Sequence, residues 1–466
     1  MSFKKGDKKV IKAWVMYDWA NSVYPLVITT TIFPLFYDKW VDKTAKLNGL
    51  EDGMAEVFGM HFNGVEIYSY AIALSLLIVS FLSPILSGVA DFSGSKKKFM
   101  RIFNYVGSIS CVGLFFWNSY SVEIGLLFCM SANIGFWGSL VFYNAYLPEI
   151  AEPKDHDLIS AQGFSKGYLG GAILLVICLT TIMVLGWDAE YSFLLVGVWW
   201  VGFAQITYRR LPGNSNEKAK GVSNREILSK GFMELQSVWR EFSKITRLKR
   251  YLISFFVFSM AVQTIMTMAQ FFGLEAIDWS IGIDFTVGQK VVVALPGMTI
   301  HPLEAARSAI IQSRMETAMI ASILAIQLIA IPGAMFFARL SKKLGNINAL
   351  VTVLCIWVCI CISAYVLTIP LHFYILASVV GFVMGGVQSL SRSTYSKFLP
   401  DTVDHASYFS FYDVLEKIGM TIGIVSFGFL TGEFNIRYSI MALTVFFVIG
   451  LILLLFVPKE EKAKEV

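Results

Sequence analysis

The sequence predicts an all-α membrane protein in which twelve transmembrane helices form two pseudo-symmetric bundles of six. Hydrophobic residues make up 56% of the 466 residues, charged residues only 15%, and the mean hydropathy is +0.63. A soluble core could not bury this much apolar surface, so lipid must surround much of the chain. A polar, basic segment separates the apolar stretches into two groups. We therefore assign residues 1–208 to an N-terminal bundle, 209–250 to a cytoplasmic basic linker, and 251–466 to a C-terminal bundle with a short cytoplasmic tail.

Each apolar stretch is long enough to cross a bilayer as a helix. A hydrocarbon core about 30 Å thick needs roughly 20 helical residues, and helices satisfy their own backbone hydrogen bonds there. The spans of the first half are expected near residues 15–37, 66–90, 99–118, 122–147, 160–185 and 190–208. Those of the second half are expected near residues 251–274, 314–338, 346–368, 371–395, 406–430 and 437–457.

Two long segments, 38–65 and 275–313, are expected on the outer side. They are interpreted as connecting loops, with a cap over the outer mouth or a partner-binding surface as alternatives. A Val-rich run at 291–293 could form a short strand.

The distribution of lysine and arginine predicts the orientation of the chain. Most of the 38 basic residues fall on one side of the predicted spans, and cytoplasmic loops hold such an excess. We therefore expect a multi-pass protein of the bacterial inner membrane with both termini in the cytoplasm. The net charge of +5 follows from this topology, so no nucleic-acid partner is expected. The basic residues at 240–250 face water or the headgroups of membrane lipid.

The sequence offers no motif for a metal, a cofactor or catalysis. The six cysteines all lie in apolar spans without a CxxC pair, and the five histidines do not group at ligand spacing. There is no P-loop, HExxH or nucleophile-elbow motif. Neither an enzyme nor an ATP-driven pump is therefore expected.

The two halves of the chain echo each other. Residues 87–94, after the second span, have a faint counterpart in residues 338–345, after the eighth. Residues 143–149 are answered by 395–401, and Lys166 by Lys417, all at nearly the same offset. This common offset indicates duplication of a six-helix unit. Parallel repeats support alternating access around a site between the halves.

The turn formed by Gly88, Asp91 and Gly94, followed by Lys96–Lys98, resembles the loop signature of the major facilitator superfamily. The resemblance implies that Asp91 lies near the start of helix eleven and helps to close the cytoplasmic side. A carboxylate at a helix N-terminus contributes about 0.3 to 1 kcal/mol. Phe92 stands where the superfamily usually has a basic residue, which implies a weaker latch. The alternative is that Asp91 only caps a turn.

Four further motifs resemble one branch of that superfamily, the autophagy-related vacuolar amino-acid effluxers and their bacterial relatives. They are residues 17–24 (YDWANSVY), 143–150 (YNAYLPEI), 167–171 (GYLGG) and 388–393 (QSLSRS). The resemblance implies a secondary transporter, with amino-acid export known for a eukaryotic vacuolar member. The sequence departs from these relatives at two places. Ser165–Lys166 stands where small or apolar residues are expected, and Ser259–Met260 stands where relatives often carry an acid.

The first span carries a polar face. Tyr17, Asn21 and Tyr24 share one side of a helix, with Asp18 on the adjoining strip, so this face should look into the bundle or a wet cavity. Pro25 removes a backbone donor and favours a kink. We predict that Asn21 and Tyr24 contact the solute and that Asp18 couples or gates transport; the alternative for Asp18 is an interfacial ion pair.

Charged and polar residues in other spans complete the candidate site. Lys166 needs a partner inside a membrane, and Asp18 is the first candidate because helices one and five are neighbours in the resembled fold. Asp413 has the spacing to reach Lys417. The remaining candidates are Glu416, with Asp413 and Lys417, for gating or proton linkage, and Asn144 and Gln388 for solute contact. Gly163, Gly167 and Gly171 form a ridge that allows close helix packing.

These observations predict a secondary active transporter that moves a small polar solute, an amino acid or related metabolite, by alternating access coupled to protons. One alternative is a permease for small peptides or peptidoglycan fragments. Another is a membrane sensor or scaffold that does not transport. We expect a monomer in contact with membrane lipid.

Overall fold

The computed structural model describes residues 4–51, 53–117, 121–213, 224–281 and 301–458. The elements of the N-terminal half are α1 (Lys8–Asn21), η1 (Tyr24–Ile32), α2 (Phe33–Asn48), β1 (Met54–Val57), β2 (Met60–Asn63), α3 (Gly64–Ser93), α4 (Lys96–Phe115), α5 (Val122–Ala145), α6 (Leu147–Ile150), η3 (Pro153–Asp155), α7 (His156–Met183) and α8 (Glu190–Arg210). After α9 (Asn224–Lys244) come α10 (Thr246–Ala276), α12 (His301–Leu344), α13 (Asn346–Val366), α14 (Pro370–Phe398), α15 (His405–Glu433) and α16 (Ile436–Leu455).

Apolar composition and length make most of these helices able to cross a membrane. Within the described residues, ten helices are long and apolar enough to do so. They correspond to ten of the predicted spans. The other two predicted spans coincide with the segment from α1 to η1, which changes helix type, and with α4, which begins with three lysines. The chain is a helical membrane protein, and the count of twelve spans stays a prediction.

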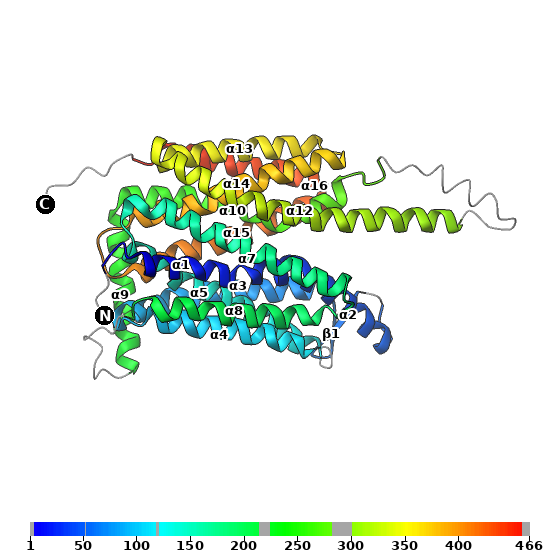
Figure 1. Cartoon of the computed structure of the whole chain (residues 1–466), viewed down its shortest axis with the longest axis horizontal. Helices are drawn as coiled ribbons and strands as arrows, with labels where there is room; N and C mark the ends of the chain where they lie inside the picture. Colours follow the sequence, from blue (N-terminus) through cyan, green and yellow to red (C-terminus); the bar gives the residue numbers. More distant parts are fainter. Residues whose placement is uncertain (1–3, 52, 118–120, 214–223, 282–300, 459–466) are drawn as a thin grey trace.

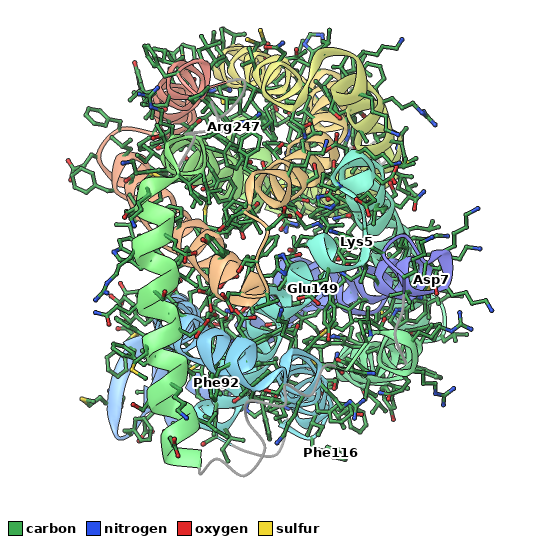
Figure 2. All side chains as sticks on the ribbon, turned by 90° about the vertical axis from the view of Figure 1, so that its left-hand side faces the viewer. Lys5, Asp7, Phe92, Phe116, Glu149 and Arg247 are labelled. Carbon is green, nitrogen blue, oxygen red and sulfur yellow. The ribbon has the colours of Figure 1, made fainter. Side chains whose placement is uncertain are left out.

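The helices lie side by side in two halves. Figure 1 shows the N-terminal half, in blue to green, below the C-terminal half, in green to red, with both termini at the left-hand end. The halves meet where α7 packs against α12 and α14, and where α3 and α5 pack against α15. At the left-hand end α9 runs across the bundle axis, and Figure 2 shows it passing from the Phe92 side toward Arg247. We call this end the terminal end.

The first predicted span is interrupted where the sequence places Pro25. The α1 helix ends at Asn21, and a π-helix continues from Tyr24 to Ile32 with Pro25 in its first turn. The hydroxyls of Thr30 and Thr31 bond to the carbonyls of Pro25 and Leu26 in this wider register. Proline cannot donate the α-helical hydrogen bond, so the change of helix type begins there.

The two long outer segments contain more helix than the sequence indicated. Residues 38–48 continue α2, and 54–63 form the β1–β2 hairpin, with Met54 paired to Asn63. Helix α12 begins at His301, well before the predicted start at 314. The Val-rich run at 291–293 lies outside the described residues.

Glycines set the distance between α1 and α7. A Cβ on Gly163 would lie 2.3 Å from the Asp18 Oδ2 atom, and one on Gly167 would lie 2.3 Å from the Ser22 Oγ atom. Side chains at these positions would push the helices apart. The predicted ridge therefore packs against α1 and holds Asp18 close to α7.

Candidate functional site

A buried ion pair joins the two halves. Asp18 in α1 and Arg392 in α14 are 4% and 3% exposed, and the Arg392 Nη2 atom lies 3.1 Å from the Asp18 Oδ2 atom. Tyr143 of α5 donates its hydroxyl to the same carboxylate oxygen at 2.8 Å. Charges taken out of water need such direct partners. Asp18 is thus held by one hydrogen bond within its own half and one ion pair to the other half.

The rest of the Arg392 guanidinium is also held by the N-terminal half. Its Nε and Nη2 atoms donate to the hydroxyl and carbonyl of Ser160, each at 2.9 Å, and Nη1 donates to Asn144 at 3.4 Å. Its charged carbon lies 4.9, 5.5 and 4.1 Å from the ring centres of Trp14, Tyr143 and Phe164. The planar fork of arginine suits this combination of ring faces and oxygen acceptors.

The predicted pairing of Asp18 with Lys166 is wrong. Lys166 is exposed on the side of α7 that carries Ile173 and Ile177, whereas Gly163 and Gly167 face α1. The rotation of α7 about its axis therefore directs the lysine away from Asp18. Arg392 takes its place; it stands within the 388–393 motif and was not singled out. Arg392 is a cation within a predicted span of the other half, and this was the signal by which it could have been chosen as the partner of Asp18.

The four predicted solute contacts fall into two groups. Asn144 contacts Arg392, and Gln388 of α14 accepts a hydrogen bond from Tyr168 of α7, so both lie where the halves meet. Asn21 and Tyr24 are each 1% exposed, and the Tyr24 ring packs on Phe136 and Trp200 inside the N-terminal bundle. The polar face of helix one does look into a bundle, but Tyr24 points away from the meeting surface.

A second buried charge group lies on α15. Lys417 bonds to Asp413 one turn earlier, and its Nζ atom lies 4.4 Å from the ring centre of Trp137 in the other half. Ser83 of α3 donates to Asp413 at 3.3 Å. The third predicted member, Glu416, instead accepts a hydrogen bond from Gln263 at 2.7 Å.

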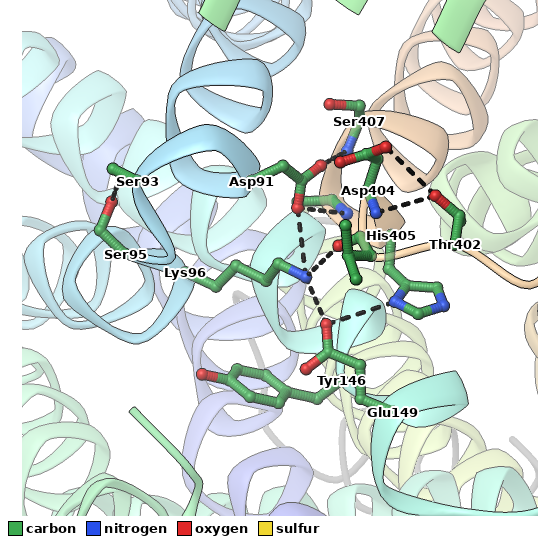
Figure 3. A network of polar contacts seen from close by, with 12 residues as sticks. Asp91, Ser93, Ser95, Lys96, Tyr146, Glu149, Thr402, Asp404, His405 and Ser407 are labelled. Atoms are coloured by element: carbon green, nitrogen blue, oxygen red, sulfur yellow. Dashed lines mark hydrogen bonds and ion pairs between the residues drawn. The ribbon is translucent and has the colours of Figure 1, made fainter. Parts of the chain in front are cut away.

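Asp91 lies at the N-terminus of α15 (Figure 3). Its carboxylate accepts the backbone N–H groups of Ala406 at 3.3 Å and Ser407 at 2.7 Å. These are amide groups that the first turn of a helix leaves unpaired. Gly94 closes the turn before α4 with φ of 65°, a left-handed conformation that glycine adopts readily. The sequence placed Asp91 in this position through the superfamily resemblance; its role as a gate stays a prediction.

Lys96 connects this latch to a second carboxylate. Its Nζ atom lies 3.1 Å from Asp91, contacts Glu149, and donates to the carbonyl of Val403 at 3.0 Å. Burial lowers the pKa of Lys96, but the carboxylates of Asp91 and Glu149 raise it further, so that it lies above its ordinary value. Lys96 is therefore held in its charged form, and the ring of His405 lies 3.3 Å from Glu149.

A third connection between the halves was missed by the sequence reading. Asp157, in the first turn of α7, lies 2.5 Å from the Nζ atom of Lys397 at the end of α14. The Ser341 hydroxyl and the Asn346 amide donate to the same carboxylate at 2.6 and 2.7 Å. Asp157 is 1% exposed. Asp157 stands before the predicted span at 160–185 and was not singled out from the sequence.

Comparisons with known proteins agree on family and fold. The family model "Vacuole effluxer Atg22 like" matches residues 6–298 and 304–466. The chain is similar to the "Uncharacterized MFS-type transporter YxiO" of Bacillus subtilis, at 29% identity over 96% of this chain and 94% of that protein. It is also similar to "Autophagy-related protein 22" of Pyricularia oryzae, at 22% identity over 88% of this chain and 70% of that protein.

Solved structures show the same architecture. The human organic anion transporter MFSD10 covers 97% of this chain, with all of its own length matched, at a TM-score of 0.66 and 11% identity. The major facilitator transporter FucP in its outward conformation covers 97%, with 98% of its own length matched, at 0.62 and 12% identity. The proton:xylose symporter XylE covers 97%, with 95% of its own length matched, at 0.65 and 12% identity. At these identities the likeness shows the fold. The chain therefore belongs to the Atg22-like vacuole effluxer family and has the fold of the major facilitator transporters.

Proposed function

We propose that this chain is a secondary active transporter that moves an amino acid or a related small polar metabolite by alternating access, coupled to protons. The buried Asp18–Arg392 pair carries the proposal, because its two members belong to different halves. The terminal end can open only if this pair separates.

Separation of the pair has a defined chemical consequence. Removing one partner from a buried ion pair destabilises a protein by about 3 to 5 kcal/mol, because the other charge is left without a counter-ion. An opened terminal end would present a carboxylate on α1 and a guanidinium on α14 to an entering solute. A solute that satisfies both charges stabilises this open form.

An amino acid in its zwitterionic form carries the two matching groups. Its carboxylate suits the planar fork of Arg392, and its ammonium group suits Asp18. Asn144 and Gln388 lie beside this pair and offer further polar contacts. Membership of a family of vacuole effluxers agrees with movement of solute out of a compartment.

Proton coupling is proposed to use the carboxylates between the halves. Asp18 and Asp413 are each 4% exposed, and Glu416 is partly buried. When the terminal end opens, such a group changes its exposure and its neighbours, and both changes alter its affinity for a proton. We assign the terminal end to the cytoplasm of a bacterial inner membrane, because it receives most of the lysines and arginines.

Counterflow in proteoliposomes tests the proposal. Purified protein is reconstituted with an unlabelled solute inside, and uptake of labelled solute is followed for amino acids, dipeptides and peptidoglycan fragments. Saturable exchange of amino acids is expected. Exchange of peptides or peptidoglycan fragments alone would replace the substrate class, and no exchange with any compound would favour a sensor or scaffold.

Asp18→Asn tests the role of the ion pair. The variant should lose counterflow of the solute, because it removes the negative charge that pairs with Arg392 and that would bind the ammonium group of the solute. Lys166→Met is the matched control, since this residue lies on the exposed side of α7; it should transport as the parent protein does. Unchanged counterflow in Asp18→Asn would remove Asp18 from the transport mechanism.

A further inference from the structure

We infer that α9 is a strap that lies in the lipid headgroup region at the terminal end and holds α3 and α15 together. The partner of this surface helix is lipid, whatever the solute is. With the orientation proposed above, the lipid surface is the inner leaflet, and anionic lipid is its favoured component.

Helix α9 contacts both halves of the molecule. Gly231 of α9 crosses Gly88 of α3 so closely that a Cβ on Gly88 would lie 2.2 Å from the Gly231 carbonyl oxygen. Further along α9, the Phe242 ring packs 5.8 Å from that of Phe411 in α15. One continuous helix therefore bridges the meeting surface of the halves, beside the Asp91 latch. Gly88, part of the loop signature, here accommodates the backbone of the linker helix.

The two long sides of α9 face in opposite directions. Trp239 packs 5.3 Å from Phe411, which lies almost a full turn farther from the terminal end than Tyr408. On the other side, Glu241 accepts the Tyr408 hydroxyl at 3.5 Å, and Lys230 lies over the ring of Phe92, near the end of α3. The side with Trp239 thus faces the membrane interior, and the side with Lys230 and Glu241 faces away from it.

Apolar side chains are exposed on the membrane side of α9. Phe232 and Trp239 are 58% and 55% exposed, and their seven-residue spacing puts them on one side of the helix. Large aromatic side chains exposed in this way are characteristic of helices that lie in a bilayer interface. On α3, which α9 contacts, Phe81 is also 75% exposed.

The segment that contains α9 is basic. Between residues 224 and 250 the chain has seven basic and three acidic residues, and Arg240 and Lys244 are exposed on α9. Basic residues near an anionic leaflet strengthen attachment to the membrane. Aromatic insertion with a basic surround therefore fits an anionic lipid leaflet.

The accessibility of spin labels tests whether α9 lies in the lipid headgroup region. Labels are introduced by Ser243→Cys, beside the Trp239 side, and by Ser237→Cys, on the opposite side, after replacement of the exposed Cys355 and Cys359 by alanine. In nanodiscs that contain phosphatidylglycerol, the label at 243 should collide several-fold more with oxygen relative to a water-soluble nickel complex than the label at 237. Equal ratios at both positions would show that α9 does not lie in the lipid headgroup region.

The anionic preference and the strap have their own tests. Arg240→Gln with Lys244→Gln should reduce the immersion of the 243 label in phosphatidylglycerol to that measured in phosphatidylcholine; an unchanged depth would exclude headgroup charge. Gly231→Leu should separate α9 from α3 and lengthen the distance between spin labels at Lys98 and Asn348, which lie in different halves at the terminal end. Ser237→Leu is the matched control, and an effect no larger than in this control would overturn the strap.

Discussion

The two halves meet twice at the terminal end, and the two crossings are closed by different chemistry. At the crossing of α3 and α15, Asp91 accepts backbone N–H groups of the opposite half, and its cation, Lys96, comes from its own half. At the crossing of α7 with α12 and α14, Asp157 forms an ion pair with Lys397 of the opposite half.

The difference separates two loop segments that stand at nearly the same offset in the two halves of the sequence. By the offset of the repeat, Asp91 corresponds to Lys342, so the second loop has no acid at this place. The carboxylate of that crossing is supplied instead by α7, and its hydrogen-bond donors are side chains, Ser341 and Asn346. Side-chain donors and a cation are lost one at a time by substitution, whereas the amide groups of a helix end are not. The Asp157 crossing should therefore be the more sensitive of the two.

Asp157→Asn should give the largest effect. The substitution leaves Lys397, which is partly buried, without its counter-ion, so the closed form should lose up to about 3 kcal/mol relative to the open form. Double electron–electron resonance between labels at Lys98 and Asn348 measures the two populations in nanodiscs.

Two variants control this experiment. Glu152→Gln changes an exposed carboxylate just before α7 and should leave the distance distribution unchanged. Lys397→Met combined with Asp157→Asn removes both charges of the pair and should recover most of the closed population. A double variant as open as the single one would show that the pair does not act as a unit.

Asp91→Asn should have a smaller effect, about 1 to 2 kcal/mol. The amide oxygen can still accept one N–H group of α15, and Lys96 keeps its contact with Glu149. The same distance measurement, made side by side with Asp157→Asn, gives the ranking. A larger shift for Asp91→Asn would reverse the comparison between the crossings.

Ser341→Ala should destabilise the closed form by about 1 kcal/mol, because Asp157 loses one of its donors and keeps Lys397 and Asn346. Ser396→Ala is the matched control, since this buried hydroxyl has no hydrogen-bond partner among the described residues. Equal distance distributions in the two variants would show that Ser341 adds nothing to the crossing.

Phe92→Leu should give the smallest effect, about 0.5 kcal/mol. The Lys230 Nζ atom lies 5.6 Å from the ring centre of Phe92, and a cation over an exposed ring contributes in this range. Lys230→Met should produce a shift of similar size, and the two changes together should not add. Additive shifts would separate Lys230 from the Phe92 ring.

Much of the fold and part of the site could be predicted from the sequence. Ten predicted spans coincide with helices that can cross a membrane, because apolar length is a local property and lipid forces each segment to satisfy its own hydrogen bonds. The Asp413–Lys417 contact was also predictable, since both residues stand on one helix at a spacing of four. The position of Asp91 at the start of α15 followed from the resemblance of the 88–98 segment to the loop signature of the superfamily.

The tertiary structure alone decided which charges meet across the halves. Asp18 and Arg392 are 374 positions apart, and their contact depends on the rotation of each helix about its axis and on the way the halves dock. A rotation of one residue along a helix, about 100°, separates a buried position from a lipid-facing one, which is why Lys166 was assigned to the wrong partner. The sequence by itself determined the helices and their polar inventory. The packing of α1, α7 and α14 determined the ion pair, because phase and docking are set by all the side chains of the interface together.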